Sequence, residues 1–220
     1  MSDAPTAGRT RDADRSRDAI LDAAEGLFAE GGYDATSLQA IGERAGVSRG
    51  TPGYFFGSKE ALYAAVLERI FAAERAFVAE AEARSLEGST DAEPERVLAA
   101  IVGSFLDFLA ARPSYVRLLE REALAGGAAL RATAAHAATI REGLGLASEL
   151  LRSGTGDAPG RAGASAPAAL MLALLSLCWF PFAHADTYGR DLGLDIREPA
   201  ARARYRDYVV GLVLRGIAAS

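Results

Sequence analysis

Cysteine, histidine and lysine are almost absent from this chain of 220 residues, which has one, two and one of them respectively. The single cysteine, Cys178, cannot form a disulfide within the chain. The two histidines, His136 and His184, show none of the His-x-x-x-His or Cys-x-x-Cys spacings that are typical of metal and redox sites. We therefore expect a protein that is not an enzyme, with no metal and no cofactor.

A secretory leader and a membrane span are also missing from the pattern. The first 25 residues carry charges throughout, unlike a signal peptide, so we expect a cytoplasmic protein. The one long uncharged stretch, 162–185, contains Pro167 and Pro181, with only 13 residues between them. At 1.5 Å per residue these reach about 20 Å, short of the ~30 Å hydrocarbon core of a bilayer. We expect a buried core helix here and no contact with a membrane.

Positive charge is scarce as well, since the formal net charge is −5 and residues 1–60 hold seven basic and ten acidic groups. This balance excludes a protein that coats nucleic acid by bulk attraction, but it leaves room for a small local basic site. If such a site binds DNA, its affinity should depend only weakly on salt.

The chain has little aromatic character, at 8%, and alanine makes up about a fifth of it. No segment alternates with a period of two, so no strand is expected and the fold class is all-α. Residues 1–16 are charged and predict a flexible tail, or alternatively an arm that lies on DNA. From Arg17 the apolar residues follow helical spacing until Gly31 and Gly32 end the helix.

Two short helices follow, separated by a turn. Ser37 is a typical N-cap for the first, and Gly46 permits the turn after it. Ser48 is a second N-cap, and Val47 fills the space between the helices. Two short helices around a glycine turn form a helix-turn-helix, so residues 17–63 predict a compact three-helix DNA-binding domain.

The remaining residues, 64–220, predict one helical domain. Ser58 is expected to cap a long helix over 59–86, and the next helices follow from the prolines, glycines and apolar spacing. They are expected at 94–112, 113–125, 128–152, between Pro167 and Pro181, and from Pro199 onward, with breaks over 87–93 and 153–165.

Many positions of the first domain together resemble the DNA-binding domain of the TetR family of bacterial transcriptional regulators. The matching residues are Gly32-Tyr33, Thr36-Ser37, Ile41, Ala45-Gly46-Val47-Ser48, Gly50-Thr51, Tyr54, Phe56 and Ser58-Lys59-Glu60-Ala61-Leu62. The resemblance implies a ligand-responsive regulator, usually a repressor, that binds a palindromic operator. It also implies that a helical ligand-binding and dimerisation domain follows.

Elementary chemistry gives these residues roles at DNA. Arg49 can bind a guanine through two hydrogen bonds, and Gly50 lets the backbone approach the duplex. Hydroxyls and amides at helix starts bind phosphate well. The candidate DNA contacts are Thr36, Ser37, Ser48, Arg49, Gly50, Thr51, Tyr54 and Lys59. Each of the capping hydroxyls, taken alone, is more often an ordinary helix cap than a DNA contact.

The sequence departs from the family pattern at Pro52-Gly53, where members commonly carry a large apolar residue and then tyrosine. Pro52 lacks an N–H for the helix bond to Ser48, and Gly53 loosens the helix. We expect a short or distorted recognition helix. A regulator that has lost DNA binding and acts through protein contacts is therefore an alternative; a small helical enzyme is the other.

The last helix carries a wide apolar stripe that can pair with its copy in a homodimer, or that simply closes the core of one chain. Its candidate interface residues are Tyr205, Tyr208, Val209, Leu212, Val213 and Gly216. The family resemblance implies an effector in the helical domain, which we expect to be a hydrophobic or aromatic molecule. Its candidate lining residues are Phe105, Phe108, Leu118, Glu122, Trp179, Phe182 and Tyr188.

Overall fold

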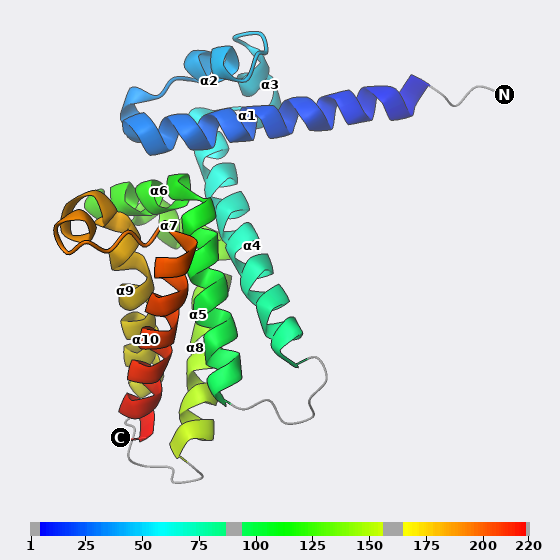
Figure 1. The fold of residues 1–220 in the computed structure, drawn as a ribbon. Helices are drawn as coiled ribbons and strands as arrows, with labels where there is room; N and C mark the ends of the chain where they lie inside the picture. Colours follow the sequence, from blue (N-terminus) through cyan, green and yellow to red (C-terminus); the bar gives the residue numbers. More distant parts are fainter. Residues whose placement is uncertain (1–4, 87–93, 156–164, 219–220) are drawn as a thin grey trace. The chain divides into compact units, whose positions relative to one another are not determined.

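The computed structural model describes residues 5–86, 94–155 and 165–218, and every regular element in these ranges is helical (Figure 1). The all-α fold class is therefore confirmed. The expected break at 87–93 and most of the expected loop at 153–165 lie outside the described residues. The helices are α1 (Pro5–Ala35), α2 (Leu38–Arg44), α3 (Thr51–Phe56), α4 (Lys59–Leu86), α5 (Pro94–Ala111), α6 (Pro113–Leu124), α7 (Ala128–Ala132), α8 (Ala134–Thr155), α9 (Ala166–Ala183), the π-helical turn η1 (Ala185–Gly189) and α10 (Pro199–Ala218).

Contacts divide the chain into two compact units. The first, which we call the head, contains the described residues up to Ile70 together with Arg117–Ala134. The second, the body, contains Phe71–Val116 and the described residues from Ala135 onward. The sequence placed the boundary at residue 63. The contacts place it slightly later in the same helix α4, after Ile70, and they add Arg117–Ala134, which includes most of α6 and all of α7, to the head.

The core of the head forms where α1 packs on α2 and α3. Ile20, Ala24 and Phe28 recur at helical spacing on α1 and are fully buried, as are Ile41 of α2 and Leu62 of α4. Apolar residues at i, i+4 and i+8 form one stripe along a helix. The stripe expected from the sequence is thus the one that holds the three-helix head together.

The first helix begins earlier than the sequence predicts, at Pro5 rather than near Arg17. Arg15 forms an ion pair with Asp12 at 2.9 Å, one helical turn away, and the Ser16 hydroxyl donates to the Asp12 carbonyl. A charged sequence of this kind forms a solvated helix as readily as a tail, because i, i+3 pairs of opposite charge stabilise it. At the other end, Gly32 leaves helical geometry with φ 83°, as expected for a glycine stop.

The body is a set of long helices, with α5 packed on both α9 and α10 (Figure 1). Val209 and Val213 of α10 are buried in this packing. These two valines close the core of one chain, and their place in a dimer interface stays a prediction. Tyr205 donates its hydroxyl to the Leu177 carbonyl of α9 at 2.8 Å.

The helix expected over 128–152 is in fact two helices. The backbone of Thr133 is extended, with φ −87° and ψ 121°, and its hydroxyl donates to the Ala129 carbonyl. A threonine hydroxyl that binds the carbonyl four residues back satisfies the helix end where the chain turns. Thr133 thereby ends α7, and α8 starts at Ala134.

Helix α9 differs from the buried core helix that the sequence predicts. It runs through Pro181, so its 18 apolar residues are continuous, and it is long and apolar enough to cross a membrane by length and composition. Only 6% of these residues are buried. Leu172 and Phe180 are exposed, whereas Cys178 is buried on the body side. The helix is apolar on both faces, and in the described ranges the chain covers only part of it.

Candidate nucleic-acid interface and ligand cavity

The recognition segment, residues 48–56, is held close to α2 by a glycine. A Cβ atom on Gly42 would lie 3.1 Å from the Ser48 carbonyl oxygen and 3.4 Å from both Arg49 Cα and Pro52 Cδ. Backbone atoms cannot move aside cheaply, so this close approach requires glycine. Gly42 is buried in α2, and the sequence analysis missed it. The only signal was an isolated glycine within a short predicted helix.

The recognition helix is short, as expected from Pro52: α3 has six residues. Ser48 does not cap it through a backbone amide, contrary to the prediction. Its hydroxyl instead pairs with the Thr51 hydroxyl at 2.7 Å, and its carbonyl accepts from the Thr51 N–H at 2.9 Å. Because Pro52 has no N–H, the first turn closes on Thr51 one residue earlier. Pro52 itself is buried and takes the place of the family's apolar residue.

Four of the candidate DNA contacts on this segment are exposed: Ser48, Arg49, Gly50 and Tyr54. The Arg49 side chain is 71% exposed and pairs with Glu43 of α2 at 3.0 Å. Tyr54 is 86% exposed, with its ring 5.5 Å from that of Phe55. Gly50 has ordinary helical geometry, with φ −84°, and a Cβ there would meet no atom within 4 Å. Nothing in the described part of the head requires glycine at position 50.

Ser37 is the expected N-cap of α2, since its hydroxyl accepts from the Ala40 N–H at 3.1 Å. The cap is exposed, so the same hydroxyl remains accessible at a helix start. Ser37 therefore stays a candidate phosphate contact as well as a cap.

Two candidate contacts are used inside the head instead. Thr36 is buried, and its hydroxyl donates to the Gly32 carbonyl at 2.8 Å. Lys59 donates to the carbonyls of Tyr33 and Thr36 at 2.9 and 3.0 Å, with Nζ 4.2 Å from the centre of the Tyr33 ring. Carbonyls near the end of α1 bind both side chains, and their phosphate contacts stay predictions.

The second half of α6 is fastened to the same end of α1. Arg121 donates to the carbonyls of Ala29 and Glu30 at 3.0 and 2.6 Å, and these are the last carbonyls of the regular part of α1. Beside it, the Tyr63 hydroxyl donates to the buried Glu122 carboxylate at 2.6 Å. Burial and this bond raise the pKa of Tyr63 well above its usual range. Arginine at a helix C-terminus is favoured by the dipole, but its partner could not be found from sequence spacing.

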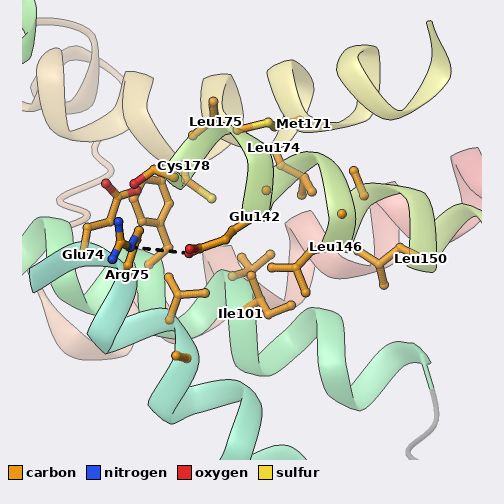
Figure 2. A pocket seen from close by; sticks show the side chains of 18 of the residues that line it. Glu74, Arg75, Ile101, Glu142, Leu146, Leu150, Met171, Leu174, Leu175 and Cys178 are labelled. Carbon is orange, nitrogen blue, oxygen red and sulfur yellow. Dashed lines mark ion pairs between the residues drawn. The ribbon is translucent and has the colours of Figure 1, made fainter. Parts of the chain in front are cut away.

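The body contains a cavity of about 660 Å³ between α4, α5, α8 and α9 (Figure 2). Most of its wall is apolar, and its polar groups are Glu74 and Arg75 of α4 together with Thr139, Glu142 and Glu149 of α8. Arg75 Nε lies 3.5 Å from Glu142 Oε2. The remaining lining residues are Ala72, Ala76, Val78, Ala79, Ile101, Val102, Phe105, Gly143, Gly145, Leu146, Ala147, Leu150, Met171, Leu174, Leu175 and Cys178.

Comparison with known proteins identifies the family. The family of tetR bacterial regulatory proteins matches residues 20–66, and a tetracyclin repressor-like C-terminal domain matches residues 94–213. NicS, an HTH-type transcriptional repressor of Pseudomonas putida, is 30% identical over 217 residues, which is 99% of either chain. The chain belongs to the TetR family. It is thus a DNA-binding transcription regulator and not an enzyme.

Solved structures of other transcriptional regulators share the fold. A transcriptional regulator of Streptomyces coelicolor, SCO4942, superposes with a TM-score of 0.65 at 25% identity, over 91% of this chain and 97% of the other. The regulator FadR of Bacillus subtilis, solved with stearoyl-CoA, gives a TM-score of 0.62 at 18% identity, over 90% and 97%. At that identity the second likeness concerns the fold alone.

Most of the effector residues predicted from the sequence do not line the cavity of this TetR-family body. Phe105 does, but the other six do not. Phe108 and Leu118 are core residues, Trp179 packs edge-on against Tyr115, and Glu122 belongs to the head. Phe182 is half-buried and Tyr188 is exposed. The prediction followed large aromatic residues, whereas the cavity is lined by alanine, leucine and three glutamates.

The most perturbed carboxyl group of the cavity is Glu74. It is only 5% exposed, and it accepts a hydrogen bond of 2.5 Å from the Tyr115 hydroxyl of α6. Burial raises the pKa of Glu74 to about 7, although the Tyr115 bond and Arg75 both act to lower it. Glu74 therefore exchanges its proton near neutral pH. The sequence gave no hint of this, because Glu74 lies in an ordinary charged stretch of a long helix.

The predicted dimer residues of α10 lie on different faces of the helix and differ in exposure. Tyr208 is 61% exposed, Leu212 is also exposed, and Gly216 lies on the same side. Tyr205 is half-buried by its bond to α9. The exposed group remains a candidate interface, and exposed apolar residues of α9, Leu172 and Phe180, extend the apolar surface of the body.

Proposed function

We propose that this protein is a ligand-responsive repressor, which binds a palindromic operator as a homodimer and is released by a small molecule bound in the body. The observation that carries the DNA-binding part is the exposed set Arg49, Gly50 and Tyr54 on the recognition segment. The charged and polar groups around this set, Thr36 and Lys59, are bound within the head and fix its shape. Arg49 has the fork geometry that reads guanine in the major groove.

Gly50 also supports a close approach of DNA to the recognition segment. Glycine destabilises a helical position by about 0.5–1 kcal/mol relative to alanine. At Gly50 neither the backbone geometry nor a neighbouring atom of the head calls for it. A glycine that the fold does not need is explained if the DNA backbone lies against it. Ser37, Ser48 and Thr51 are then placed to contact phosphates beside it.

A homodimer explains the apolar surface of the body. Leu172 and Phe180 of α9 and Tyr208 and Leu212 of α10 are exposed large apolar side chains. Helices that expose several large apolar side chains are typical of an interface. We propose that a second copy, and not a lipid bilayer, covers it, and that the protein works in the cytoplasm beside its DNA. Two copies would read two half-sites related by a twofold axis.

The cavity of the body is the proposed effector site. Its size is within the range of about 300–1,000 Å³ for small-molecule sites, and its wall is mostly apolar. The FadR structure shows that the same fold can hold a small molecule, stearoyl-CoA in that protein. To release DNA, an effector must favour the non-binding conformation by about 1–3 kcal/mol.

The decisive experiment is selection of bound sequences from random duplex DNA with the full chain. Our proposal expects a palindrome whose half-sites lie one or more helical turns apart, and sedimentation of a dimer at micromolar concentration. Selection without enrichment, even at low salt, would overturn DNA reading and favour a regulator that acts through protein contacts. Enrichment of a single half-site by a monomer would overturn the dimer alone.

A further inference from the structure

The cavity of the body has a polar end and an apolar end. Figure 2 shows Glu74 and Arg75 with Cys178 at one end, and Leu146 and Leu150 toward the other. A cavity with this division fits an elongated molecule that has one polar head group and an apolar tail. The side chains at the polar end of the cavity then determine which polar group of the ligand can bind.

Charge at the polar end favours a cation over an anion. Three glutamates and one arginine line the cavity, and Arg75 is paired with Glu142. Glu142 and Glu149 are exposed, and each forms an ion pair. Glu74 is the buried one of the three cavity glutamates, and it forms no ion pair with the described part of the chain. An anionic head group would have to break the Arg75–Glu142 pair beside a buried carboxyl. A cationic group would instead pair with Glu74.

The Thr139 hydroxyl is a further polar group in the wall of this cavity. The Thr139 hydroxyl oxygen is shielded from solvent and makes no hydrogen bond with the described part of the chain. Thr139 lies on α8 one turn before Glu142, and both line the cavity. Buried hydroxyls are almost always hydrogen-bonded, so an unpaired one in a cavity wall points to a ligand atom. It can accept from an N–H group.

We propose that the cavity binds a hydrophobic amine, whose ammonium group is held by the Glu74 carboxylate and the Thr139 hydroxyl and whose apolar tail lies between α5, α8 and α9. This inference rests on the proposed effector site and names the chemical class of its ligand. The Tyr115 hydroxyl keeps one oxygen of Glu74 in place, and the ammonium group binds the carboxylate beside it.

If the ligand is an amine, its affinity should depend on pH, because binding is linked to the loss of a proton from Glu74. The ionisable groups around Glu74 are Arg75 on α4, Tyr115 on α6, Glu142 on α8 and Cys178 on α9. Burial raises the pKa of Tyr115 far above 10 and that of Cys178 to about 12, so both stay protonated at neutral pH. Glu74, with a pKa of about 7, must lose its proton to bind a cation. Affinity for an amine should therefore rise about tenfold from pH 6 to pH 8.

Three probes with the same ten-carbon tail test the proposal: decylamine, decanol and decanoate, titrated into the full chain by calorimetry at pH 6 and pH 8. We expect decylamine to bind at least tenfold more tightly than either of the others at pH 8. Stronger binding of decanoate would overturn the proposal in favour of an anion site at Arg75. Equal binding of all three would overturn it in favour of an apolar slot without head-group selection.

Matched variants locate the head group. E74Q keeps the shape of the side chain and an oxygen for Tyr115, and it should weaken decylamine about 10-fold or more while decanol binds as before. T139V should weaken decylamine a few-fold. E149Q removes an equal charge from the exposed edge and should change affinity less than twofold. If E149Q weakens decylamine binding as much as E74Q does, the preference for the amine is a general effect of acidic charge, and the assignment to Glu74 is wrong.

A DNA-release assay separates this inference from the proposed function. If decylamine binds as described but leaves operator affinity unchanged, the ligand class stands and the effector role fails. If decanol or decanoate releases DNA and decylamine does not, the effector role stands and the amine class fails.

Discussion

In the head, charged side chains are bound by backbone carbonyls: Lys59 and Arg121 together bind four carbonyls near the end of α1. In the body, the buried charged group Glu74 faces a cavity and is bound by one tyrosine hydroxyl. A cation that binds carbonyls fixes the chain. A buried carboxyl beside an empty space can still change its charge and its partner.

This difference separates the tasks of the two units. A surface that reads DNA must hold Arg49 in place before the duplex arrives, and here Arg49 is paired with Glu43 of α2. A site that responds to a ligand needs a group whose state the ligand can change. The head accordingly has fixed polar contacts, and the body has a carboxyl group that titrates.

The largest effect that tests this comparison concerns the stability of the body and pH. The pKa of Glu74 is about 7 in the folded chain, against 4.5 for an ordinary glutamate. Between these values the folded state keeps a proton that the unfolded state has lost. Stability therefore falls as pH rises through this window, by about 3 kcal/mol in total. Urea unfolding followed by fluorescence of Trp179, the single tryptophan and a residue of the body, measures it.

E74Q should remove this slope, and E149Q is the matched control that should keep it. The variant is expected to be more stable than the wild type at pH 8 and close to it at pH 5. A wild-type chain whose stability is constant from pH 5 to pH 8 would mean that Glu74 is ionised throughout, and the contrast with the head would be lost.

Arg49 gives the next largest effect, on the head. R49A should cost about 1–3 kcal/mol of DNA affinity and relax the preference at one base position, because a bidentate arginine–guanine contact is lost. Binding to an operator set with every base varied in turn measures both. R44A is the control: Arg44 pairs with Glu30 on the head and should affect all sequences weakly and equally. A uniform loss with R49A would make Arg49 a phosphate contact instead.

The two units also differ in how far their sites could be predicted from sequence. The head was predicted well because caps, glycines and apolar spacing act locally: Ser37, Gly46 and the α1 stripe have the expected roles. The bonds of Thr36 and Lys59 within the head were not predicted, because their partners are carbonyls 4 to 26 residues away. Local pattern states that a group is polar, and tertiary packing decides what it binds.

In the body the same reasoning found the helices but missed the cavity. A cavity is the space that side chains leave, and its wall at Ala72, Ala76 and Ala79 is made by residues that are small. The prediction chose large aromatic residues, which fill space, and so it chose core positions such as Phe108. Gly143 was noted as a weak point of its helix, whereas it actually makes room for Met171, whose Cε lies 2.6 Å from a Cβ built there.

Substitution of two glycines of the head should have a smaller effect on stability and DNA affinity. G50A should leave the stability of the head unchanged or raise it by up to about 1 kcal/mol, since the added methyl meets no atom. DNA affinity should fall, because the methyl stands where the duplex backbone approaches. Thermal unfolding and operator binding, measured together, separate the two effects.

G42A is the counterpart inside the head. Its methyl would lie 3.1 Å from the Ser48 carbonyl oxygen, so the recognition segment must shift, at a cost of about 1–3 kcal/mol for overpacking. Stability and DNA affinity should therefore fall together in G42A and move apart in G50A. If G50A binds DNA as the wild type does, position 50 does not face the duplex.

Tyr54 should show the smallest effect. Its hydroxyl is exposed and suited to donate to a phosphate, so Y54F should weaken all DNA sequences about equally, by about 1 kcal/mol. The phosphate contacts also set the salt dependence. Because residues 1–60 carry more acidic than basic groups and Lys59 is bound internally, the slope of log affinity against log salt should be shallow. A slope that implies ten or more neutralised phosphates would require basic groups that this head does not offer, and would place part of the DNA contact elsewhere in the chain.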